Sequence, residues 1–429
     1  MTQTKTEKAW EILFDKYNIL QNIRENGYYE IQAKEIKMVR EPRLMAKFDH
    51  YSQLPKLFKD NNLSILPISR SRYVIGEFDV YEKVTYNEKL KPIHVDFPNE
   101  ITTIDPTNLY SESAALHCAH VTGMMENVLG EQSFQTISGR MSSREFDFNI
   151  RTNNGHDRNI KIKNSQIEID GGYESQNIFM IVEAKNETVD DFLIRQLYYP
   201  FRLWQEKTYK QVLPVFFTYS NDIFSFFIYE FTDLKRYNSL KLVEQKDFII
   251  AHERIDFEDI LEVYKSVQIS SEPQIPFPQA DSFTRVVDLL GLLVEDDLSK
   301  EYITRNYDFD ERQTNYYTSA GMYLGLIDKY RDNENKQIMF TLTKLGRKIM
   351  KLKTKEKYLK LARTILEHKP FYLVLEKYFK TSSLPERWQV IEVMKQCDLY
   401  NVNSESTYFR RSSTVISWVN WILDLPEIY

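Results

Sequence analysis

A short apolar run that turns abruptly charged places the strongest constraint on this chain. Residues 178–182 read Ile-Phe-Met-Ile-Val, which is typical of a strand buried within a sheet. Glu183, Ala184 and Lys185 follow immediately. Buried carboxylates and ammonium groups cost free energy unless they are paired or bound to a metal. The sequence therefore predicts a buried sheet with a paired or metal-bound cluster of charges at one strand end.

A second predicted strand lies just upstream. Residues 166–170 alternate polar and apolar side chains, and Gly171-Gly172, the one Gly-Gly pair of the chain, is expected to end this strand. A polar turn over residues 173–177 would then form a hairpin that brings Asp170 beside Glu183 and Lys185, which share one face of their strand. Two carboxylates are a common protein contribution to a Mg²⁺ site. Asp170 and Glu183 are thus the candidate metal ligands, and Lys185 is expected to position or deprotonate a water.

This arrangement, Asp170 followed after twelve residues by Glu183-Ala184-Lys185, resembles the signature of the PD-(D/E)xK nuclease superfamily, which includes most type II restriction endonucleases. The resemblance implies an α/β (α+β) fold with a mixed central sheet flanked by helices, dependence on Mg²⁺, and hydrolysis of DNA phosphodiester bonds. It also implies that Gln196, on the next predicted helix, lies near the phosphate, and that Glu112, on an upstream predicted helix, is an additional acid. Ile169 stands where many members have proline. A Glu-x-Lys pair that only protects an exposed sheet edge is the alternative.

Three prolines mark the clearest domain boundary. Pro273, Pro276 and Pro278 lie within residues 269–279 and predict an extended connector. Turn residues near 98–106 indicate a second boundary. We therefore expect an N-terminal accessory domain over residues 1–100, a nuclease domain over 101–268, a DNA-binding domain over 280–350 and a helical region over 351–429.

The segment after the connector resembles a winged-helix domain. Helices are predicted near residues 282–294, 299–306 and 311–325, with Asp310 as an N-cap, and a hairpin follows up to residue 343. The third helix begins with side chains that can bind base edges or phosphate. These are Arg312, Gln313, Asn315 and Tyr316.

The last predicted helix begins near residue 404 and carries Arg410 and Arg411. It indicates a second helix–turn–helix with the arginine pair toward DNA, and a helical dimerisation module is the alternative. Residues 341–380 add twelve Lys or Arg against three Glu, whereas the whole chain carries a net charge of −6. This segment is either a phosphate-binding surface or an ordinary solvated face.

Other classes of protein are excluded by what is missing. The chain has 12 glycines and contains neither G-x-G-x-x-G nor a P-loop motif, so no glycine-rich nucleotide site is expected. Cys118 and Cys397 form no CxxC pair, and no apolar run approaches the roughly 18 residues of a membrane span. We expect a cytoplasmic protein that does not act at a membrane.

The predicted function is that of a type II restriction endonuclease. It would cleave double-stranded DNA with Mg²⁺, act as a homodimer at least on DNA, and work beside a cognate DNA methyltransferase. The alternatives are a methyl-directed or repair nuclease of the same superfamily, and a winged-helix DNA-binding regulator without catalysis.

Overall fold

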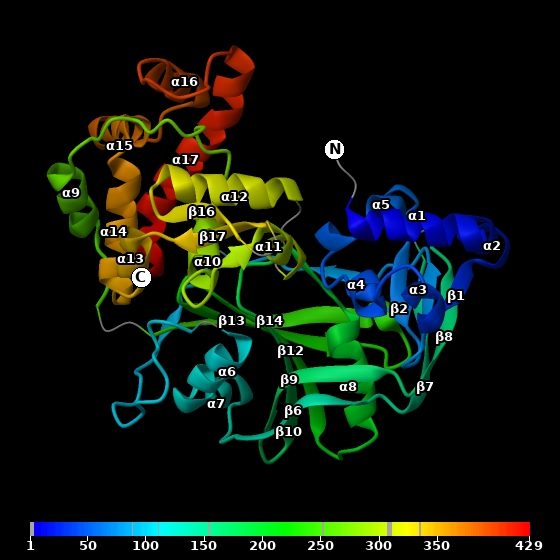
Figure 1. The fold of residues 1–429 in the computed structure, drawn as a ribbon. Coiled ribbons are helices and arrows are strands. Elements are labelled where there is room, and N and C mark those ends of the chain that lie inside the picture. Colours follow the sequence, from blue (N-terminus) through cyan, green and yellow to red (C-terminus); the bar gives the residue numbers. More distant parts are fainter. Residues whose placement is uncertain are drawn as a thin grey trace.

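The computed structural model describes residues 4–87, 89–109, 111–152, 155–250, 253–306, 311–333 and 336–429. The fold mixes helices and strands around a mixed central sheet, as predicted (Figure 1). The N-terminal region and the C-terminal helices lie over the same end of this sheet. They approach each other where Arg40 Nη2 lies 3.9 Å from Glu301 Oε1.

The N-terminal region is a small helical layer on a three-stranded sheet. Asn18 adopts a left-handed conformation with φ of 48° and separates the first two helices. Trp10, Phe14 and Phe58 pack edge to face in the core of the region. Its helices are α1 (Lys5–Tyr17), α2 (Ile19–Asn26), α3 (Ala33–Lys37), α4 (Pro42–Ala46) and α5 (Lys56–Asp60); its strands are β1 (Tyr28–Gln32), β3 (Arg72–Gly76) and β2 (Ser64–Pro67), in that order.

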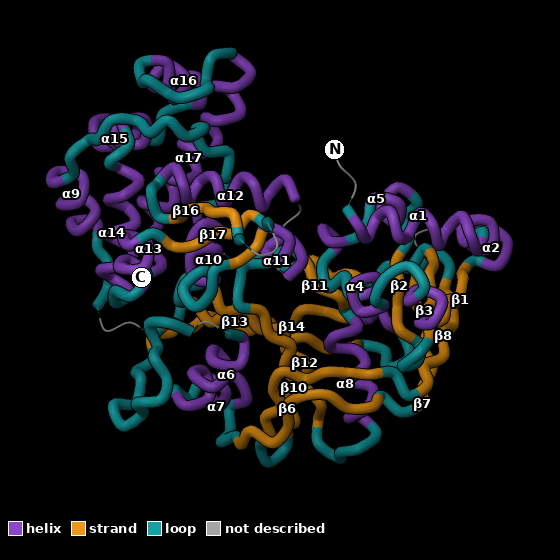
Figure 2. Tube along the Cα trace, in the orientation of Figure 1, coloured by secondary structure: helices purple, strands orange, loops and turns teal. Residues whose placement is uncertain are grey.

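The central sheet has seven strands in the described part of the chain (Figure 2). Their order is β5 (Ile93–His94), β14 (Leu240–Ile249), β13 (Ile223–Phe231), β12 (Gln211–Ser220), β10 (Ile178–Lys185), β9 (Gln166–Glu174) and β6 (Phe134–Ser142). The β10–β12 and β14–β5 pairs are parallel and the other pairs are antiparallel. The sheet is therefore mixed, with β10 well inside it.

Helices cover both faces of this sheet around β10. Met180, Val182 and Ala184 belong to the same hydrophobic cluster as α6 (Glu112–Val121) and α7 (Met124–Leu129). Phe179 and Ile181 point the other way and pack with α8 (Arg195–Gln205). Strand β10 is thus buried on both sides, as its unbroken apolar run predicts.

The Gly-Gly pair lies inside a strand and does not end one, so the predicted turn boundary was wrong. Strand β9 continues to Glu174 and turns only at residues 175–177. A Cβ atom on Gly171 would lie 2.7 Å from a ring atom of Tyr173, and one on Gly172 would lie 3.1 Å from Phe179. The glycines therefore make room for two aromatic rings.

Short strands attach the N-terminal region to the sheet layer. Strand β4 (Tyr81–Lys83) pairs with β11 (Asp191–Leu193), which directly precedes α8. The hairpin of β7 (Glu145–Arg151) and β8 (Asp157–Lys163) packs beside α8 through Phe148 and Tyr198. Sequence analysis had identified none of these four strands.

The described C-terminal residues share one hydrophobic core, which includes Trp418 and Trp421. Helix α9 (Phe257–Ser266), expected in the nuclease domain, packs on this side against α14 (Thr354–Leu366) and α17 (Glu405–Ile428). Asp310 lies outside the described residues. The other elements are α10 (Phe283–Leu292), β15 (Leu298–Ser299), α11 (Lys300–Asn306), α12 (Glu311–Tyr323), β16 (Ile327–Arg331), β17 (Ile338–Leu342), α13 (Lys344–Met350), α14 (Thr354–Leu366), α15 (Lys369–Thr381), α16 (Arg387–Lys395) and α17 (Glu405–Ile428).

Among the helices that the described ranges contain, none is both long enough and apolar enough to cross a bilayer.

Candidate active site

The charged end of β10 lies next to β9, and the three signature residues meet there. Val182 pairs with Gly171, which places Asp170 beside Glu183. Asp170 Oδ2 accepts a hydrogen bond of 2.8 Å from the backbone N–H of Ala184. Lys185 Nζ donates to Glu183 Oε1 over 2.5 Å. The hairpin therefore brings Asp170, Glu183 and Lys185 together, as the sequence predicted.

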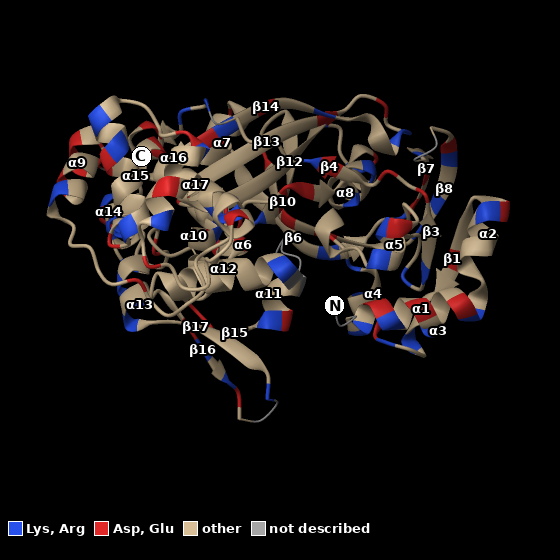
Figure 3. Cartoon of the chain, turned by 90° about the horizontal axis from the view of Figure 1, so that it is seen from above, with Lys and Arg blue, Asp and Glu red and all other residues tan. Residues whose placement is uncertain are grey.

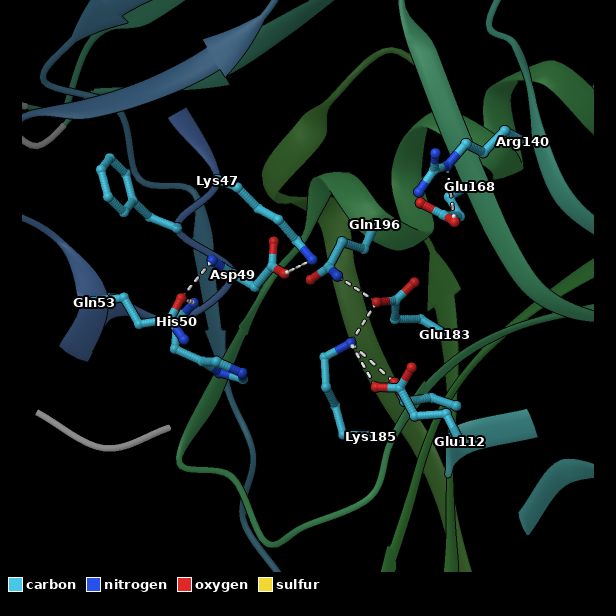
Figure 4. A network of polar contacts seen from close by, with 12 residues as sticks. Lys47, Asp49, His50, Gln53, Glu112, Arg140, Glu168, Glu183, Lys185 and Gln196 are labelled. Carbon is cyan, nitrogen blue, oxygen red and sulfur yellow. Dashed lines mark hydrogen bonds and ion pairs between the residues drawn. The ribbon is translucent and has the colours of Figure 1, made fainter. Parts of the chain in front are cut away.

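The two further predicted residues also reach this cluster (Figure 4). Gln196, on the first turn of α8, donates from Nε2 to the same Oε1 atom of Glu183. Glu112 starts α6, whose N-terminus is capped by Ser111, and its Oε1 lies 3.9 Å from Lys185 Nζ. All five predicted residues thus surround the end of one strand.

Burial makes this cluster electrostatically unusual. Glu183 is 6% exposed, and its burial, followed by repulsion from Asp170, raises its pKa to about 7. Burial likewise raises the pKa of Asp170 to about 6 and also raises the pKa of Glu112. Burial opposes the charge of Lys185, but Glu183 and the other acids raise its pKa overall. The site holds more negative than positive charge and favours uptake of a cation.

These residues fit a Mg²⁺ ion bound jointly by protein and substrate. In the described ranges, no group of three or more His, Cys, Asp or Glu side chains is arranged to hold a metal by itself. Mg²⁺, however, usually takes one or two carboxylates and completes its shell with water and phosphate oxygens. Asp170 and Glu183 supply such a pair. Their pKa values are raised chiefly by burial, which disfavours the charged carboxylates unless a cation compensates them.

The N-terminal region contributes two charged residues that sequence analysis missed. Lys47 Nζ lies 3.2 Å from Asp49 Oδ2, and the Asp49 backbone carbonyl accepts from Leu193 N, just before α8. Asp49 Oδ1 is buried and has no hydrogen-bond partner among the described residues. Burial opposes the charge of Asp49, but Lys47 and Lys185 outweigh it and lower its pKa. Asp49 is therefore an ionised carboxylate beside the cluster. No local motif signals it, because the contact joins segments far apart in the chain, through the hydrogen bond from Leu193 N to the Asp49 carbonyl.

The predicted DNA-binding residues lie on two helices of the C-terminal region that meet at Tyr316 and Arg411. Arg312 is exposed at the start of α12, and its Nε donates to Tyr316 Oη over 2.6 Å. Gln313 and Asn315 lie on the same helix, and Arg410 and Arg411 lie near the start of α17. Burial lowers the pKa of Arg411, and Tyr316 partly offsets this effect. The interaction between Arg411 and Tyr316 joins the two predicted groups.

The basic segment 341–380 is partly neutralised within the fold. Lys357 Nζ lies 2.7 Å from Asp222, and Lys355 Nζ lies 2.7 Å from Asp259. Arg347 and Lys380 also form ion pairs. Figure 3 shows acidic and basic residues mixed around α9 and α14. The segment is therefore not a uniform phosphate-binding surface.

Three family models match successive parts of the chain. Each is described as a domain of unknown function: DUF6996 over residues 7–75, DUF6997 over 76–249 and DUF7226 over 285–427. Neither the curated proteins nor the solved structures contain a significant match. Asp49 lies in the first matched segment, the five clustered residues lie in the second and the predicted DNA-binding residues lie in the third. Each of the three matched segments thus contains one part of the arrangement described above.

Proposed function

We propose that the protein is a Mg²⁺-dependent endodeoxyribonuclease of the PD-(D/E)xK type, with the activity of a type II restriction enzyme. The observation that carries the proposal is the meeting of Asp170, Glu183 and Lys185 at the end of a buried central strand. A mixed sheet covered by α6 on one face and α8 on the other supports it further, because the superfamily resemblance implies that layout.

Asp170 and Glu183 would hold the metal. When bound there, Mg²⁺ lowers the pKa of a coordinated water and offsets charge on the phosphate. Gln196 orients Glu183 by donating to its Oε1 atom. Neighbouring acids raise the pKa of Lys185. Lys185 is therefore proposed to remain protonated, to position the water and to offset negative charge, and not to remove a proton.

Helices α10, α11 and α12 with the three-stranded sheet β15–β17–β16 support the winged-helix interpretation. Arg312, Asn315, Tyr316 and Arg411 would contact duplex DNA. Cutting both strands requires two active centres, so a homodimer on DNA is part of the proposal. A methyltransferase that protects the host sequence is the expected companion.

The test is cleavage of methylated and unmethylated plasmid DNA by the purified protein with Mg²⁺. Lys185→Ala is expected to reduce cleavage at least about 100-fold. Lys210→Ala is the matched control, because Lys210 is also largely buried and pairs with Glu174 at the opposite end of the β9–β10 hairpin. Discrete fragments that persist in Lys210→Ala support the proposal.

Other outcomes decide between the alternatives. Cleavage that requires methylated DNA identifies the methyl-directed nuclease. Absence of cleavage of both plasmids refutes the nuclease proposal and leaves the DNA-binding regulator, in which Lys185 and Glu183 are only a structural ion pair.

A further inference from the structure

The loop that links Lys185 to α8 is held by the C-terminal region. This loop, residues 186–190, lies between β10 and β11. Asp288 on α10 accepts a hydrogen bond of 2.9 Å from the backbone N–H of Thr188 at its Oδ2 atom. Arg285 Nη2, one turn earlier on α10, lies 2.8 Å from Asp190 Oδ1. Residues three apart share a helix face, so α10 contacts the loop at two points, Thr188 and Asp190.

The same carboxylate also fixes the turn between β12 and β13. Asp288 Oδ1 accepts from Ser220 Oγ at 2.7 Å and from Asn221 Nδ2 at 3.1 Å. Ser220 Oγ in turn lies 2.7 Å from Thr188 Oγ1. Asp288 therefore joins two segments of the sheet domain, one directly after Lys185 and one at the end of the neighbouring strand.

The turn is anchored from other C-terminal elements as well. Lys357 on α14 pairs with Asp222 at 2.7 Å, and Tyr429 Oη donates to the backbone carbonyl of Asn221 over 2.6 Å. These contacts do not touch residues 186–190. Asp288 is thus distinguished by reaching the loop and the turn together.

The environment of Asp288 favours a role in fixing the positions of the loop and the turn. Its side chain is buried at 7% exposure and accepts hydrogen bonds from Thr188, Ser220 and Asn221. Burial raises its pKa to about 6 in spite of these bonds. A buried charge is a poor source of stability compared with apolar packing, but its directional hydrogen bonds restrict where partners can lie.

Several polar side chains lie around Asp288, where α10 meets the loop and the β12–β13 turn. A cavity of about 50 Å³ adjoins it, lined by Asn186, Asn221, Asp222 and Asp288 among others. Asn186 Oδ1 and Asn221 Oδ1 are buried without a hydrogen-bond partner in the described residues. Such a cavity suits water. On this side the loop is held by directional contacts, whereas Val189 is packed in the apolar cluster with Phe192 and Leu197.

We propose that Asp288 is a positioning residue for the nuclease centre: by holding residues 186–190 it fixes Lys185 and Glu183 relative to α8. The inference rests on the proposed nuclease function. Because α10 also packs against α12, one helix connects the candidate DNA-binding surface to the loop beside the candidate active site.

The experiment compares Asp288→Asn with Asp259→Asn. The control removes a carboxylate of the same region that pairs with Lys355 and makes no contact with the loop. Single-turnover cleavage at saturating duplex DNA is measured, with DNA affinity from fluorescence anisotropy without divalent metal. Asp288→Asn is expected to slow cleavage about tenfold and to leave affinity within about twofold of the original protein. Amide hydrogen exchange in residues 186–190 is expected to be faster in Asp288→Asn alone.

Each result has a defined meaning. Unchanged cleavage by Asp288→Asn, with Lys185→Ala inactive, overturns the inference and leaves the nuclease function intact. Equal losses in Asp288→Asn and Asp259→Asn overturn it too, because they indicate general destabilisation. If Asp288→Asn does not fold, Ser220→Ala removes one contact of the same carboxylate and is expected to slow cleavage in the same direction. A wild-type protein that cuts no DNA refutes the nuclease function and the inference together.

Discussion

Lys185 Nζ lies 2.5 Å from Oε1 of Glu183, the acid two residues before it on the same strand. Strand alternation places both side chains on one face, and Gln196 donates to the same oxygen from the next helix. Glu183 is therefore oriented by two independent donors. The candidate site is built so that the acid keeps one hydrogen bond if the other is removed.

Replacement of Gln196 by alanine tests this arrangement. We expect Gln196→Ala to lower the single-turnover cleavage rate by about tenfold, less than Lys185→Ala, because Lys185 still orients Glu183. Gln205→Ala, an exposed change at the end of the same helix, should have no effect. A Gln196→Ala rate equal to that of the wild-type protein would show that orientation by α8 is unimportant.

The raised pKa of Glu183 predicts an unusual dependence of stability on pH. Its pKa is about 7 in the folded protein against 4.5 ordinarily, so the folded state retains a proton that the unfolded state has lost. The stabilising contribution is complete below pH 4.5 and is lost as pH rises through 7.

Urea denaturation without divalent metal is the measurement for this effect. Between pH 5 and pH 8, the wild-type protein should lose up to about 3 kcal/mol more free energy of unfolding than Glu183→Gln. Glu168→Gln, at a half-exposed acid on β9, is the control and should follow the wild type. If the free energy of unfolding changes equally with pH in the wild type and in Glu183→Gln, the raised pKa does not arise from burial of Glu183.

Addition of Mg²⁺ should have the opposite dependence on pH. Metal binding requires ionised carboxylates, so the rise in melting temperature with Mg²⁺ is expected to be larger at pH 8 than at pH 6. The pKa of Asp170 is about 6 and that of Glu183 about 7, which places the change in this interval. Asp170→Asn should remove most of the rise. An equal rise in that variant would place the metal elsewhere.

Local sequence patterns identified the centre of the site but not its surroundings. The charged end of an apolar strand predicted β10 and the grouping of Asp170, Glu183 and Lys185, because strand alternation and hairpin pairing are local rules. The position of the turn was wrong, because Gly171 and Gly172 serve the packing of Tyr173 and Phe179, which only the folded structure reveals.

Contacts between segments far apart in the chain were not predictable. Asp49 is held beside the site by the hydrogen bond from Leu193 N, and Asp288 reaches the loop by accepting from Thr188 N. Neither contact leaves a periodic pattern or a motif. The expected domain boundary near 268 also missed that α9 packs with the C-terminal helices, because a proline-rich connector marks a bend in the chain and not the partner of the preceding helix.

Asp49 is expected to act with the candidate active site despite its position in the N-terminal region. Asp49→Asn removes an ionised carboxylate that interacts with both Lys185 and Glu183, so it should weaken the binding of Mg²⁺. We expect a calorimetric Kd for Mg²⁺ about three- to tenfold higher, with the melting temperature little changed. Asp60→Asn at the end of α5 is the matched control. An unchanged affinity for Mg²⁺ would show that Asp49 only forms the ion pair with Lys47.

The surface shared by α12 and α17 predicts coupled effects on DNA affinity. Arg312→Ala and Arg411→Ala should each weaken duplex binding about tenfold and reduce the salt dependence of the Kd, because each removes a phosphate or base contact. Since Tyr316 interacts with both arginines, the double variant should deviate from additivity.

Arg236→Ala, which breaks an exposed ion pair with Asp157, should leave the affinity unchanged. Titrations by fluorescence anisotropy at two salt concentrations measure all four proteins. Loss of affinity in Arg236→Ala alone would place the DNA on the β7–β8 side of the molecule. Strict additivity of the two changes would show that α12 and α17 contact DNA independently.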